Sequence, residues 1–111
     1  MIIVHENVWH YGNAATIVLA EGKALCHVSV DKEKPNEAFL SNLIVHETVR
    51  NQGLGNQLLA EAEKYAKEHG LSTMFLQTYT DAWCYEWYRR HGYEIFKAKY
   101  NNMIYLMKKL T

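Results

Sequence analysis

The sequence predicts a mixed α/β (α+β) fold, with a mostly antiparallel sheet of about six to seven strands and two main helices. Short β-like segments, separated by turn-prone residues, fill the first 45 residues. Residues 54–66 then carry apolar side chains at helical spacing. An apolar segment follows this helix at once, and strand, helix and strand in succession predict a parallel pair within the sheet.

Length and composition predict a single domain over residues 1–111. The 111 residues leave no room for a second core. The chain is 49% hydrophobic and 22% charged, which is typical of a globular protein. We expect it to fold alone or as a small oligomer.

Charge and sequence signals argue against several classes of protein. Twelve basic and twelve acidic residues cancel, so the sequence predicts no nucleic-acid or anionic membrane partner. No segment approaches the roughly 18 apolar residues of a membrane span, and the N-terminus does not resemble a signal peptide. Cys26 and Cys84 lack CxxC spacing, and the six histidines lack ligand spacing. We expect reduced thiols, no metal and a cytoplasmic location.

The first 45 residues predict four strands, the last three of them an antiparallel meander. In the third strand Cys26 and Val28 alternate with His27 and Ser29, which predicts two different faces. The only proline lies in a charged segment expected to form an exposed hairpin loop. The expected strands are 2–8, 16–20, 24–30 and 39–45, with connections at 11–13, 21–23 and 31–37.

The first helix is the longest predicted element. It begins around Gly53 to Gly55, and Gly70 suits the position after its end. Glu63 and Lys67 are spaced as a favourable i,i+4 ion pair on its surface. Its apolar positions are Leu54, Leu58, Leu59, Ala62 and Ala66.

A buried strand is expected at 73–77, followed by a second helix. Asp81 is the expected N-cap of this helix, which runs through Arg90 and ends at Gly92. Two further strands are predicted at 93–98 and 103–107, joined by a turn at Asn101 and Asn102.

Residues 50–55 form a glycine-containing loop between a strand and a helix N-terminus, where free backbone N–H groups favour phosphate binding. A P-loop requires Gly-Lys-Ser/Thr, but Asn56 and Gln57 follow Gly55. A dinucleotide-binding turn requires a third glycine where Leu58 stands, and an acidic residue is missing after the next strand.

Arg50-x-x-Gly53-x-Gly55 instead resembles the Arg/Gln-x-x-Gly-x-Gly/Ala motif of the GNAT N-acetyltransferase superfamily. Residues 81–93 resemble the second-helix pattern of the same superfamily, which ends in Gly followed by an aromatic residue. The two matches cover roughly residues 40–96. The chain resembles a short member, because too few residues separate its first two strands to hold the superfamily's usual pair of N-terminal helices.

The resemblance implies a central parallel strand pair that splays around a CoA site, and acetyl-CoA as co-substrate. The acetyl group would pass to a primary amine by direct attack on the thioester. Tyr88 corresponds to the tyrosine that commonly acts as general acid toward the CoA thiolate. Asp81 replaces the usual asparagine near the pantetheine. The implied cofactor-binding residues are Leu43, Ile44, Val45, Arg50, Asn51, Gln52, Gly53, Leu54, Gly55, Asn56, Asp81 and Tyr88.

The general base is left open. An alkyl ammonium must lose its proton before attack, which calls for a base or a water chain. Family members often carry a carboxylate on the strand before the loop, where this chain has Ser41 and Asn42. His27 and Glu47 are the candidate bases, with His46 behind them, and an amine of low pKa could react without one.

The acceptor is also open. Without the N-terminal helices the acceptor side is expected to be uncovered, which slightly favours an extended amine such as a lysine side chain or a peptide N-terminus. The rival expectation is a homodimer whose second copy completes a pocket for a small molecule. Two other functions remain alternatives: a CoA-binding module without turnover, and an interaction protein that keeps only the fold.

Overall fold

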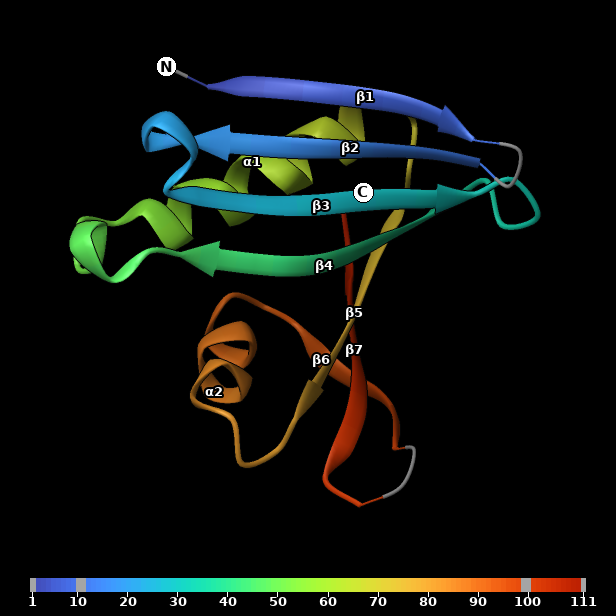
Figure 1. Cartoon of the computed structure of the whole chain (residues 1–111). Coiled ribbons are helices and arrows are strands. Elements are labelled where there is room, and N and C mark those ends of the chain that lie inside the picture. Colours follow the sequence, from blue (N-terminus) through green and yellow to red (C-terminus); the bar gives the residue numbers. More distant parts are fainter. Residues whose placement is uncertain (1, 10–11, 99–100, 111) are drawn as a thin grey trace.

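The structure, a computed structural model, describes residues 2–9, 12–98 and 101–110. The described residues form one mixed sheet with two α-helices (Figure 1). The elements are β1 (Ile3–Trp9), β2 (Gly12–Leu19), η1 (Ala20–Gly22), β3 (Ala24–Asp31), β4 (Glu37–Val45), η2 (Glu47–Val49), α1 (Leu54–Glu68), β5 (Thr73–Tyr79), α2 (Trp83–Arg90), β6 (Glu94–Ala98) and β7 (Met103–Lys109).

The strands follow the order β1-β2-β3-β4-β5-β7-β6. All neighbours are antiparallel except β4 and β5, which are parallel because α1 connects them. The predicted mixed fold, the meander and the parallel crossover are therefore confirmed.

The parallel pair is joined only at its beginning. β4 and β5 pair at three positions, the last of them Phe39 opposite Phe75. Beyond Phe39, β4 pairs with β3 alone, and Figure 1 shows the two parallel strands diverging. A register shift in β4 accompanies the divergence, and Asn42 adopts a positive φ of 52° there. The edge of β4 that faces β5 is thus left without a strand partner from residue 40 onward.

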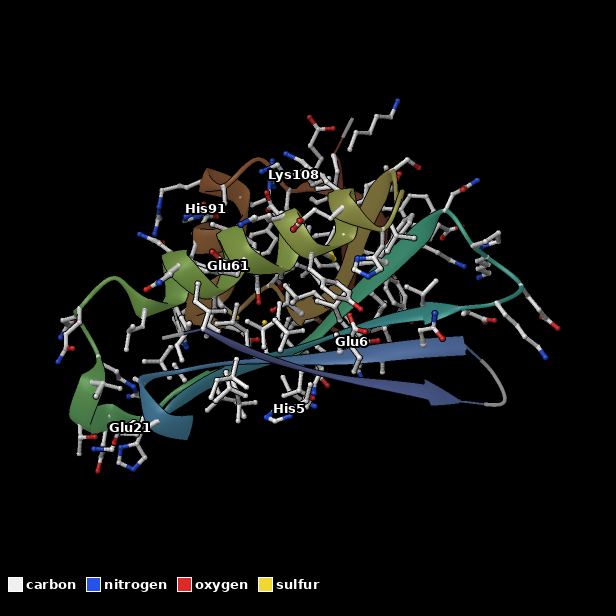
Figure 2. The ribbon with its side chains drawn as sticks, turned by 90° about the horizontal axis from the view of Figure 1, so that it is seen from above. His5, Glu6, Glu21, Glu61, His91 and Lys108 are labelled. Atoms are coloured by element: carbon white, nitrogen blue, oxygen red, sulfur yellow. The ribbon has the colours of Figure 1, made fainter. Side chains whose placement is uncertain are left out.

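The core lies between α1 and one face of the sheet (Figure 2). Burial alternates along β3 as predicted, with Ala24, Cys26 and Val28 buried. Leu58 and Leu59 of α1 are fully buried against this face, and each contributes about 1.5–3 kcal/mol by leaving water. Both helices end as the glycines predict, because Gly70 and Gly92 have φ values of 76° and 93°.

The opposite face of the sheet is called the open face here. Register places the side chains of Thr16, His27, Ser29, Phe39 and Ser41 on it. Among the described residues, no helix covers it on β1 to β4, and Figure 2 shows His5 pointing from β1 to this side, away from α1.

Several details of the prediction are wrong. β2 begins at Gly12, inside the turn predicted at 11–13, and not at Thr16, whereas Tyr11 lies outside the described residues. Asp81 does not cap α2: the N-cap is Ala82, no side chain caps this helix, and Asp81 is exposed. Glu63 does not pair with Lys67. It is buried, and its carboxylate accepts hydrogen bonds of 3.0 Å from both the Tyr93 hydroxyl and Lys108 Nζ. A buried carboxylate requires such partners, and Lys67 is exposed.

Candidate functional site

A cleft of about 710 Å³ lies between the second half of β4, the loop into α1, and α2. Its position is the one created by the divergence of β4 from β5. The residues that line it are Leu43, Ile44, Val45, Arg50, Asn51, Gly53, Leu54, Gly55, Asn56, Trp83 and Trp87. Three predicted cofactor residues, Gln52, Asp81 and Tyr88, are not among them, although Gln52 belongs to the same loop.

The N-terminus of α1 opens into this cleft without a side-chain cap. Gly53 is the N-cap residue in a left-handed conformation, with φ 77° and ψ 10°. The first N–H groups of a helix have no intrahelical partner, and here Gln57 N is the first to bond back, to the Gly53 carbonyl. Leu54, Gly55 and Asn56 therefore present N–H groups that have no partner among the described residues, at the positive end of the helix dipole, which suits an anion such as phosphate.

Arg50 adds a positive charge at the edge of the cleft. Its Nε donates a hydrogen bond of 3.1 Å to the Val45 carbonyl, which holds the side chain against the end of β4. The rest of the guanidinium makes no hydrogen bond or ion pair within the described part of the chain. The group is thus held in place by one nitrogen while the others stay available to a ligand.

Trp83 and Trp87 form the wall of the cleft opposite β4. Neither residue was predicted from the sequence to line a binding site. Their rings lie 6.2 Å apart, and 76% of Trp83 is exposed. A Cβ added at Gly55 would lie at an ordinary contact distance, 3.6 Å, from the Trp87 indole. In the sequence these residues match an ordinary apolar stripe of a helix. Their i,i+4 spacing beside a phosphate loop is the only signal that could have indicated a ligand-facing role.

His91 ties the two helices together beside the cleft (Figure 2). Its Nε2 lies 3.0 Å from Asn56 Oδ1, and its Nδ1 lies 2.7 Å from the Trp87 carbonyl oxygen. The contact with Asn56 joins the end of α2 to the first turn of α1.

Tyr88 lies behind the wall of the cleft. It is buried, and its ring packs against those of Trp87 and Tyr93 at 5.0 and 5.7 Å. Burial raises the pKa of Tyr88 well above its ordinary value, with smaller contributions from Cys84 and Cys26. Its hydroxyl makes no hydrogen bond to the described residues. Every completely buried side-chain nitrogen or oxygen atom among these residues does have a partner, so the Tyr88 hydroxyl is not completely buried. The hydroxyl is therefore protonated at neutral pH and keeps some contact with solvent.

The candidate bases lie in different places. His27 sits on the open face, opposite Ser41 of β4, and its Nδ1 is 2.9 Å from Thr16 Oγ1. Its Nε2 makes no hydrogen bond to the described residues. Glu47 lies beyond the end of β4, in η2, which His46 caps through Nδ1. The structure thus brings His27, and not Glu47, to the point where β4 leaves β5.

The described residues contain no group of three or more side chains that could hold a metal ion. None of the helices among them is long and apolar enough to cross a membrane.

Several solved structures resemble the chain. An acetyltransferase from Bacillus cereus ATCC 14579 has 24% identity and a TM-score of 0.69, over 96% of this chain and 74% of that one. The PaiA N-acetyltransferase from Thermoplasma acidophilum, in complex with coenzyme A, has 18% identity and a TM-score of 0.72, over 86% of this chain and 59% of that one. N-acetylglutamate synthase from Neisseria gonorrhoeae, complexed with coenzyme A and N-acetyl-glutamate, has 15% identity and a TM-score of 0.71, over 88% of this chain and 26% of that one.

At these identities the similarity shows the fold, and the chain spans only part of each of these proteins. No curated protein matches it. Family membership rests on the sequence itself, because the profile described as "Acetyltransferase (GNAT) family" matches residues 4–93. The chain therefore belongs to the GNAT acetyltransferase family and is an acyltransferase.

Proposed function

We propose that the chain transfers an acetyl group from acetyl-CoA to a primary amine by direct attack of the amine on the thioester. The observation that carries this proposal is the cleft that joins the uncapped N-terminus of α1 to the unpaired edge of β4. The co-substrate supplies the activated acyl group, and the residues of this chain bind it, position it and move protons.

Binding divides along the cleft. The N–H groups at the start of α1 hold the pyrophosphate, with Arg50 beside it. The free backbone edge of Leu43 to Val45 pairs with the amides of the pantetheine arm, in place of the missing strand. Trp83 and Trp87 cover the other side of the arm and exclude water from it.

The proton transfers fall to two residues. Tyr88, kept protonated by its buried setting, gives a proton to the departing sulfur. His27 accepts the proton of the incoming amine at Nε2, while Thr16 holds the imidazole from the other nitrogen. This function requires the tautomer in which Nδ1 carries the hydrogen and donates to the Thr16 hydroxyl.

The acceptor approaches across the open face, where His27 and Ser41 lie beside the splay. The absence of a covering helix there favours an extended amine, such as a lysine side chain or a peptide N-terminus. A homodimer that covers this face is the competing arrangement.

Acceptor-dependent release of CoA thiol tests the proposal. Amines of several classes are supplied with acetyl-CoA, and free thiol is measured over time. Release with at least one amine supports transfer. Binding of acetyl-CoA with no release for any amine identifies a CoA-binding module, and failure to bind acetyl-CoA identifies a protein that keeps only the fold.

A further inference from the structure

A second pocket, of about 460 Å³, lies on the open face beside the splay. Its floor consists of aromatic rings from four strands: Phe39 of β4, Phe75 of β5, Phe96 of β6 and Tyr105 of β7. Phe75 and Phe96 meet edge to face with centroids 5.2 Å apart. Phe96 nevertheless keeps 55% of its surface exposed, so packing within the fold does not account for it.

This pocket continues the line of the first cleft. Phe39 and Phe75 are the last paired residues before β4 and β5 diverge, and Leu43, four positions further along β4, lines the cleft. Four residues span at most about 13 Å, and less here because Asn42, with its positive φ, interrupts the extended strand. Ser41 lies between the two and is opposite His27 on the same face. A small ligand on the aromatic floor therefore reaches the splay with a side chain of a few atoms.

The charges at the rim do not select a doubly charged ligand. Two carboxylates, Asp31 and Glu37, stand beside two ammonium groups, Lys34 and Lys97, and these four charges cancel. None of the four forms an ion pair within the described part of the chain. The aromatic floor is then the feature that distinguishes one amine from another, since aromatic rings prefer edge-to-face and offset contacts with other rings.

We propose that this pocket is the acceptor site and that it takes a small primary amine carrying an aromatic ring a few atoms from the nitrogen. The ring lies on Phe39, Phe75 and Phe96, and the amine points toward Ser41 and His27 at the splay. The inference rests on the proposed function, because it names the substrate of that acetyl transfer. It replaces the extended acceptor considered above with a compact one.

The test compares 2-phenylethylamine with 2-cyclohexylethylamine, which has the same carbon skeleton without the aromatic ring. We expect the parent protein to favour 2-phenylethylamine about tenfold in kcat/KM, since each aromatic pair contributes a factor of about 2 to 10. In Phe96→Leu the preference should fall by about fivefold. Tyr79→Leu is the matched control, because Tyr79 is an exposed ring on β5 that does not line the pocket, and it should keep the preference.

The same assay includes 1,6-hexanediamine and a lysine-containing peptide. Higher kcat/KM for either of these than for 2-phenylethylamine overturns the inference while leaving acetyl transfer intact. An equal preference in the parent and Phe96→Leu also overturns it. If no amine releases thiol, the proposed function fails. Calorimetric titration of 2-phenylethylamine into the acetyl-CoA-saturated protein then tests separately whether the pocket binds the amine. Binding that weakens in Phe96→Leu supports the pocket, and absence of binding overturns it.

Discussion

Tyr88 packs as a core residue, and its proposed role as general acid depends on its hydroxyl. Its ring fills the space between Trp87 and Tyr93, yet its hydroxyl lacks a hydrogen-bond partner among the described residues. The hydroxyl keeps some contact with solvent, so its removal should cost the packing little.

Tyr88→Phe should therefore separate chemistry from packing. We expect kcat to fall by about 10² to 10⁴-fold, which is typical of a lost general acid, while the affinity for acetyl-CoA and the melting temperature stay close to the parent values. Steady-state kinetics and calorimetric titration measure these quantities. Unchanged kcat would assign the proton to another donor.

Gly55 lies where α1 meets Trp87 of α2 at the cleft. An added Cβ would already lie at contact distance, 3.6 Å, from the Trp87 indole, so the two further methyl groups of a valine must displace Trp87 or project into the cleft. Acetyl-CoA at about 100 times its Kd should stabilise the parent by about 2.7 kcal/mol, and Gly55→Val should lose most of the resulting rise in melting temperature.

The control for Gly55→Val is Ala60→Val, on the exposed side of the same helix and away from the cleft. It also places a valine in the helix and should keep the ligand-induced rise. A full rise in Gly55→Val would contradict the assignment of the cleft to acetyl-CoA.

At the scale of elements, the sequence predicts well what depends on local periodicity. The α1 helix was predictable because its apolar residues recur at helical spacing and Gly70 ends it. The beginning of β2 was not, because Gly12 to Ala15 are small residues without an alternating pattern. They are extended since they pair with β1 and β3 on both sides.

The site was predictable only in part, for a related reason. The phosphate loop is a contiguous motif, so its residues could be named from the sequence. Trp83 and Trp87 line the cleft because α2 crosses beside α1, and the pocket on the open face gathers rings from four strands. Sequence periodicity places a residue on a face of its own element, but it does not specify which other element that face will meet.

The contact between α1 and the C-terminal hairpin depends on Glu63. This carboxylate accepts hydrogen bonds from Tyr93 and Lys108, and Glu63→Ala would leave both donors without their acceptor. Because Lys108 is partly exposed and can turn to water, we expect a loss of about 2–3 kcal/mol in the free energy of unfolding, measured by urea titration. Lys67→Ala, on the same helix, should change it by less than about 0.5 kcal/mol. Equal losses would mean that the two hydrogen bonds of Glu63 add nothing measurable to the stability.

Across the whole molecule, three buried groups with raised pKa values, Tyr88, Tyr93 and Cys26, should lower the stability of the protein at high pH. Burial raises the pKa of both Tyr88 and Tyr93 above the ordinary value, and the Glu63 carboxylate raises that of Tyr93 further. Above pH 10 the unfolded chain loses these phenolic protons while the folded chain keeps them. The unfolded state then binds fewer protons, so the free energy of unfolding falls as pH rises, by up to about 1.4 kcal/mol per pH unit for each tyrosine.

Tyr93→Phe tests this linkage. The variant loses the hydrogen bond to Glu63 and should be less stable than the parent at pH 7, but its stability should decline less steeply between pH 9.5 and 11.5. Urea titrations at several pH values give both slopes. Tyr79→Phe, which alters an exposed ring, should follow the parent curve. If the free energy of unfolding falls equally steeply with pH in the parent and in Tyr93→Phe, the alkaline loss of stability arises from other groups. The packing between α1 and residues 93–109 would then not raise the pKa of Tyr93 enough to matter for stability.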